Sequence, residues 1–184
     1  MSATIQAIKE THNPGLDTIE LSGPQISLNL FRSGGLEQFQ AFLVTAYGKS
    51  GFSIEVPLNR YGRYEPVRIN PTSERVSEDD PVDRAVVAFF NISAAEPGIL
   101  NADEVQSFRK ALEQSVPRIN EILDNSNEPQ NSSILRYSYG MNIPLDTWNA
   151  AAKSAFVERL RIGLNDLIPL VEVSSKQNMA LYFS

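Results

Sequence analysis

The residues best suited to bind a ligand surround a predicted turn at positions 59–62, where arginine and tyrosine alternate within a few residues. A guanidinium group forms paired hydrogen bonds with phosphate or carboxylate, and a tyrosine ring supplies a large rigid contact or stacks on a base. These properties predict a binding surface for another protein, with nucleic acid or a phosphorylated ligand as the alternative. An exposed turn whose tyrosines pack on a sheet would produce the same pattern without any binding role. The residues predicted to form the surface are Arg60, Tyr61, Arg63, Tyr64 and Arg68.

Residue types that commonly perform catalysis or bind metals are scarce, because the chain has no cysteine and one histidine. The lack of cysteine excludes disulfides, thiolate nucleophiles and cysteine-ligated metal centres. His12 directly precedes the turn sequence Asn13-Pro14-Gly15, so we interpret it as a loop residue. We therefore predict no catalytic residue, no cofactor and no metal site. A carboxylate-based enzyme remains an alternative if Glu55, Glu65 and the acidic segment described next converge.

The segment 70–83 is rich in acidic residues and turn formers, and acidic loops of this kind can bind calcium. It lacks the alternating ligands, the central glycine and the terminal glutamate of a calcium-binding loop of the EF-hand type. We interpret it as a solvated loop. Its acidic residues are Glu74, Glu78, Asp79, Asp80 and Asp83.

The composition is that of a soluble globular protein, with 42% hydrophobic and 21% charged residues among 184. This length suits a single domain, with N-terminal strands at 1–33 and a main body at 34–184. A formal net charge of -6 disfavours nucleic acid as a partner. No apolar run approaches the roughly 20 residues needed to span a bilayer, and residues 1–10 lack the pattern of a secretory signal. We therefore expect no membrane partner and a cytoplasmic location.

Hydrophobic periodicity predicts both strands and helices. An alternating pattern or a short apolar run predicts an edge strand at 4–9, a half-buried strand at 25–31, a hairpin at 52–58 and 64–69, a central strand at 85–90, a strand at 134–143 and a final strand or docking segment at 179–183. Apolar residues three and four apart predict helices at 36–47, 101–123 and 146–171. The strand-to-helix order occurs twice in the second half of the chain, at 89–112 and 140–160, and duplication of one unit is one explanation.

Several residues predict where the long helices begin and bend. Asn101 followed by Glu104 is typical of a capping box, and Asp146 is a candidate cap for the last helix. Pro117 and Pro169 lie inside the helical patterns, where proline removes a hydrogen bond and clashes with the preceding turn. We expect a kink or a break at each.

These elements together predict an α+β protein with a mainly antiparallel sheet and about three helices packed on one face. The order helix, three strands, helix, strand, helix from Leu36 onward resembles the small acidic chaperones of type III secretion, a resemblance of element order alone. It implies a dimer that binds extended segments of client proteins. We expect a non-catalytic protein-binding module, of chaperone, adaptor or inhibitor type, that forms a homo-oligomer through an apolar helix face or a sheet edge.

Overall fold

The computed structural model describes residues 3–9, 23–28, 35–47, 52–55, 68–71, 79–92, 98–139 and 147–184. Within these ranges the chain forms five helices and six strands, so the protein belongs to the α+β class. The elements follow the order β1 (Ala3–Ile8), β2 (Gln25–Leu28), α1 (Gly35–Tyr47), β3 (Phe52–Glu55), β4 (Arg68–Pro71), α2 (Pro81–Asn91), β5 (Gly98–Leu100), α3 (Ala102–Asp124), α4 (Pro129–Tyr139), α5 (Ala150–Lys176) and β6 (Ala180–Phe183).

The larger sheet is antiparallel and has the strand order β2-β1-β6-β5. β1 lies in the middle of this sheet, so the prediction of an edge strand at 4–9 is wrong. The prediction of a final strand at 179–183 is confirmed by β6, which pairs with both β1 and β5. Ile5 is opposite Phe183 and Ala7 is opposite Leu181, and these four side chains are buried on the same face. That face forms one wall of the core.

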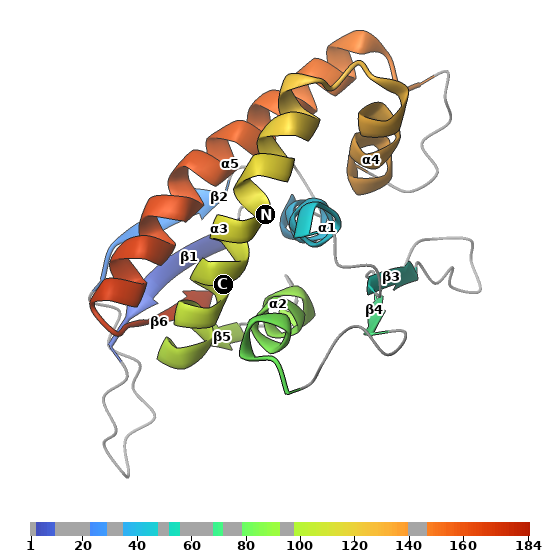
Figure 1. Cartoon of the computed structure of the whole chain (residues 1–184). Coiled ribbons are helices and arrows are strands. Elements are labelled where there is room, and N and C mark those ends of the chain that lie inside the picture. Colours follow the sequence, from blue (N-terminus) through green and yellow to red (C-terminus); the bar gives the residue numbers. More distant parts are fainter. Residues whose placement is uncertain are drawn as a thin grey trace, which may run out of the picture.

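Helices α3 and α5 cover this wall, because both contact β6, with α5 also reaching β2 and α3 reaching β5 (Figure 1). Helices α1 and α2 pack against α3, and α4 packs on α1. These three helices form a second layer outside the layer of α3 and α5 that covers the sheet. The sequence predicts about three helices, whereas the described residues form five. The difference arises because two segments predicted as strands are helical.

The first of these segments, 85–90, is not a central strand but the body of α2. Asp80 caps the helix by accepting a hydrogen bond from the Val82 backbone N–H at 2.8 Å, and Pro81 occupies the first helical position. The apolar run is continuous because two faces of the helix are buried. Phe89 enters the main core, while Val86 and Phe90 join a smaller cluster with Val44 and Ala111.

The second segment, predicted as a strand at 134–143, belongs largely to α4, although residues 140–146 lie outside the described ranges. The buried residues among its described side chains are Asn131, Leu135 and Ser138, whose spacing of four and three is helical. Two of the three are polar, which hides the helical period from a hydrophobicity pattern. The helices at α2 and α4 also remove the strands on which the resemblance to the secretion chaperones depends.

Helix α3 begins as the sequence predicts. The Asn101 side chain accepts a hydrogen bond from the Glu104 backbone N–H, and the Glu104 carboxylate accepts one from the Asn101 backbone N–H, both at 2.9 Å. Pro117 does not end the helix, which runs on to Asp124. Proline has no backbone N–H, so Pro117 leaves the Glu113 carbonyl without its helical hydrogen-bond donor. Because Pro117 is exposed, this carbonyl lies on the solvent side of α3.

Helix α5 also continues through its proline, Pro169, so of the kink or break predicted there the break is wrong. Its cap is Asn149, which accepts a hydrogen bond from the Ala152 N–H at 2.8 Å, and the candidate cap Asp146 lies outside the described residues. The helix ends in a Schellman motif, in which the Met179 N–H donates to the Ser174 carbonyl and Asn178 adopts a φ of 52°. This turn directs the chain straight into β6.

The predicted hairpin in the first half of the chain is confirmed as the antiparallel pair β3–β4, in which Phe52 is opposite Pro71 and Glu55 is opposite Arg68. The described β4 is Arg68–Pro71, and residues 64–67 of the predicted strand lie outside the described ranges. β3 lies against α1 and β4 against α2, so the pair extends the second layer of helices. None of the helices in the described ranges is both long and apolar enough to cross a membrane.

Candidate interaction surface

Most of the residues predicted to bind a ligand fall outside the described ranges. Arg60, Tyr61, Arg63 and Tyr64 all lie between β3 and β4, in a segment that the structure does not describe. Arg68 is the first residue of β4 and pairs with Glu55 across the strands. The hypothesis of nucleic-acid or phosphate binding at this hairpin therefore rests on the sequence alone.

The described part of the acidic segment has structural roles. Asp80 caps α2, and the buried carboxylate of Asp83 accepts a hydrogen bond from the Tyr47 hydroxyl at 2.6 Å, which links α2 to α1. Among the described residues, no three His, Cys, Asp or Glu side chains group together as metal ligands. His12 and Glu65 lie outside the described ranges. The carboxylate enzyme considered above thus gains no support.

Buried polar side chains elsewhere also hold elements together. Gln40 on α1 is 2% exposed, and its Nε2 donates to the carbonyls of Phe89 at 2.7 Å and Ile92 at 2.9 Å, where α2 ends. Ser115 and Ser138 each donate to the carbonyl four residues earlier in their own helix. A small hollow between α1, α2 and α3 is lined mainly by apolar side chains. These groups stabilise the fold and form no catalytic set.

The feature that the fold leaves unexplained is an apolar line along the solvent side of α5, which we call the outer line. Ile162 is 53% exposed and Val173 is 38% exposed, and the other members are exposed as well. The residues follow one another at intervals of four, seven, seven and four, which at 100° per residue places them within an arc of about 40°. The outer line consists of Ala151, Ala155, Ile162, Pro169 and Val173.

The outer line does not contribute to the core, because the opposite side of α5 is buried independently. Phe156, Leu160, Leu167 and Val171 are each fully buried and belong to the main core cluster. A helix packed on a core by one apolar side normally presents polar residues on the other. The outer line is therefore a second apolar side of α5, separate from the one that faces the core.

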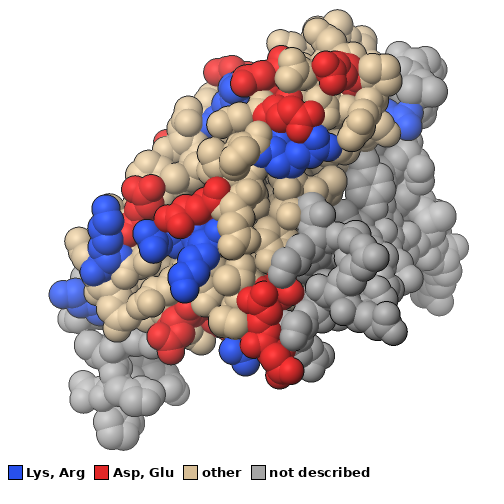
Figure 2. Space-filling model, viewed as in Figure 1, with Lys and Arg blue, Asp and Glu red and all other residues tan. Residues whose placement is uncertain are grey.

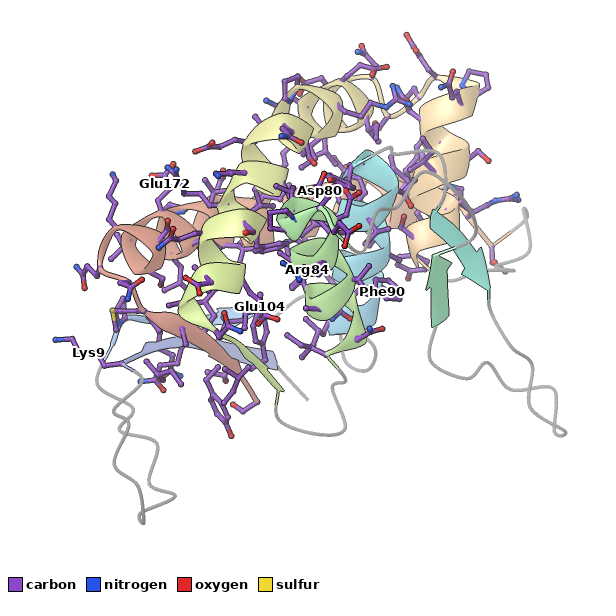
Figure 3. All side chains as sticks on the ribbon, turned by 60° about the horizontal axis from the view of Figure 1, so that its bottom comes forward. Lys9, Asp80, Arg84, Phe90, Glu104 and Glu172 are labelled. Atoms are coloured by element: carbon purple, nitrogen blue, oxygen red, sulfur yellow. The ribbon has the colours of Figure 1, made fainter. Side chains whose placement is uncertain are left out.

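Charged residues border the outer line on both sides. Asp166 and Arg159 lie on one flank, and Glu158 and Lys176 lie on the other. Glu172 projects from α5 on the side away from the sheet (Figure 3). Figure 2 shows acidic and basic side chains interspersed over the described part of the face in view, rather than a broad patch of one sign. An apolar centre with a charged border is the usual composition of a protein–protein contact.

Comparison with known proteins adds no family to this description. A scan against protein-family models found no match, and searches of curated proteins and of solved structures found no similar protein.

Proposed function

We propose that the chain is a non-catalytic protein-binding module whose contact surface is the outer line of α5. The observation that supports this proposal is the exposure of an apolar line on a helix whose core-facing side is already buried. Removal of apolar surface from water contributes about 25 cal/mol per Å², and fully burying a leucine-sized side chain contributes about 1.5–3 kcal/mol. Ile162 and Val173 would supply much of that gain, since they are the largest members of the line.

Gln40 and Asp83, the buried polar groups with the most obvious chemical capacity, are engaged in contacts between helices. The proposal keeps the class of protein expected from the sequence and moves the contact surface from the hairpin to α5.

Site-specific photo-crosslinking tests the proposal. A photoreactive amino acid replaces Ile162 in the full chain, and a second variant carries it at Gln114, an exposed position of α3 outside the outer line. In cells that express the chain, we expect position 162 to give a discrete protein adduct, identified by mass spectrometry, and position 114 to give none. Equal crosslinking at the two positions, or none at 162, would refute a contact surface on α5.

A further inference from the structure

We propose that Pro117 of α3 and Pro169 of α5 form one hinge, at which an outer part of the protein bends relative to the sheet. This outer part, which we call the tip, consists of residues 118–139 and 150–168 and contains α4. The sheet lies beside the end of α5 that leads into β6, whereas α4 lies near the opposite end of α5 (Figure 1). The inference concerns a movement within the chain and does not rest on the proposed function.

Two contacts between α3 and the α5 segment fix how the two helices are aligned. Near one end of the pair, the Gln106 Nε2 donates to the Asn178 Oδ1 at 3.2 Å. Near the other end, the Arg161 guanidinium donates to the Asp124 Oδ1 at 2.6 Å. From the first contact to the second, the position rises by 18 residues along α3 and falls by 17 along the α5 segment. The two helices are therefore antiparallel, and their residues advance at the same rate.

This alignment places the two prolines at nearly the same level. Pro117 is eleven residues after Gln106, so it lies level with positions 167–168 of α5. Its distance from Pro169 along the helix axis is then about 2–3 Å, which is less than one helical turn. A helix bends most readily where proline interrupts its hydrogen bonds. Both helices are thus weakened in the same plane across the molecule.

The weakened turns overlap, and that of α3 has a second irregularity. Each proline leaves the carbonyl four residues earlier without its helical donor, which interrupts the turns at 113–117 in α3 and at 165–169 in α5. Ser115 lies within the first of these turns and is 4% exposed. Its hydroxyl donates to the Ala111 carbonyl at 2.7 Å, a contact of a kind that often bends helices.

A bend at this level leaves no buried backbone group without a hydrogen bond. Pro117 and Pro169 are exposed, and so are Glu113 and Asn165, whose carbonyls lack their helical donors. Water can bind these carbonyls when each helix curves with its convex side toward solvent. The free-energy cost of bending is therefore small compared with the cost of breaking a buried hydrogen bond.

Helix α1 contacts both sides of the hinge, but its hydrogen bonds attach it more firmly to α2 than to the tip. The Gln40 Nε2 donates to two carbonyls at the end of α2. The Gln38 Nε2 donates to one carbonyl of α4, that of Tyr139, and the Gln38 Oε1 accepts no hydrogen bond from the residues that the structure describes. We therefore expect α1 to stay with α2 when the tip bends.

The hinge also divides the outer line of α5. Ala151, Ala155 and Ile162 belong to the tip, whereas Val173 lies on the sheet side of Pro169. A bend at the hinge therefore changes the curvature of this surface. The hinge itself depends only on the two prolines and on the alignment of α3 with α5, so it stands even if no partner binds the outer line.

Amide hydrogen exchange of the full chain, measured residue by residue by NMR, tests whether the two helices open together. We expect the amides of both interrupted turns to exchange faster than those of β1 and β6. Pro117→Ala restores one hydrogen bond in α3, and it should slow exchange roughly two- to tenfold in both turns, including the turn of α5 that it does not touch. Pro129→Ala is the matched control, because Pro129 is exposed at the first position of α4, where proline interrupts no hydrogen bond. It should change exchange in neither turn.

Three outcomes of this experiment would overturn the shared hinge. One is slower exchange that is confined to α3, since the two helices would then open separately. Another is a wild-type protein whose interrupted turns are as well protected as its sheet. The third is an equal slowing in β1 and β6, which would indicate a general gain in stability rather than the loss of a local movement.

Distances between spin labels test the bending itself. Because the chain has no cysteine, labels attach only to the cysteines introduced by Ser133→Cys on α4 and Gln25→Cys on β2, both at exposed positions. Double electron–electron resonance should give a broad distance distribution that narrows when Pro117 and Pro169 are both replaced by alanine. Pro129→Ala should leave the width unchanged. A distribution equally wide with and without the hinge prolines would overturn the proposal.

Discussion

Replacement of Gln40 by leucine should destabilise the protein by about 2–4 kcal/mol. The side chain is 2% exposed and donates to two carbonyls at the end of α2, those of Phe89 at 2.7 Å and Ile92 at 2.9 Å. Leucine is similar in size but cannot donate. The Phe89 carbonyl retains a weak bond from the Ile92 N–H at 3.4 Å, whereas no other donor to the Ile92 carbonyl is evident among the described contacts. Each lost hydrogen bond costs about 0.5–1.5 kcal/mol, and an unsatisfied buried acceptor costs about 1–3 kcal/mol.

Urea unfolding, followed by far-UV circular dichroism and tryptophan fluorescence, measures this effect as a lower transition midpoint at unchanged slope. Gln114→Leu on the exposed side of α3 is the matched control, and it should change the free energy of unfolding by less than about 0.5 kcal/mol. A Gln40→Leu variant as stable as the wild type would show that the two carbonyls do not depend on this amide, and the account of how α1 holds α2 would fail.

Three further substitutions test other parts of the fold, with urea unfolding as the measurement. Asn101→Ala should cost about 0.5–2 kcal/mol, because it removes half of the capping box of α3, and an unchanged midpoint would contradict that role. Pro117→Ala should stabilise the protein by about 1–3 kcal/mol by restoring a helical hydrogen bond, and a loss of stability would show that the proline is needed there. Phe156→Ala should cost about 3–5 kcal/mol, since this ring is fully buried 5.1 Å from that of Tyr139, and a cost below about 1 kcal/mol would refute its place in the core.

The sequence predicts elements well where the deciding signals are local. The capping box of α3 needs only Asn101 and Glu104, and the strands β2 and β6 show their alternation or apolar character directly. Helix α2 is missed because its run of apolar residues has no period, as both of its faces are buried by separate clusters. The sequence Asp80-Pro81, a capping residue followed by proline, is the local signal that marks the start of α2.

The pairing of strands depends on contacts that the sequence does not reveal. β1 looks like an edge strand because its alternation is weak, yet it lies between β2 and β6. Its second neighbour, β6, is contributed by residues 180–183. Strands this far apart in the chain carry no mark that identifies them as partners, so only the tertiary structure settles their order.

The interaction surface shows a different limit. Regular spacing makes both apolar lines of α5 visible in the sequence, including the outer line around Ile162. Which line faces the core depends on how α3 and the sheet pack on the helix, and this follows from the whole fold. Phe156 and Leu160 lie on the line that faces the core, and Ile162 lies on the exposed one.

The position of β1 between β2 and β6 has a consequence for how the protein folds. Ile5 pairs with Phe183, a contact that spans nearly the whole described chain, so the sheet has a high contact order. On a ribosome, β1 emerges first and cannot gain its second neighbour until α5 and β6 have been synthesised. Until then one edge of β1 stays open to other chains, as unpaired strand edges in nascent proteins do. We therefore expect folding to be slow for a largely helical protein, with the centre of the sheet closing last.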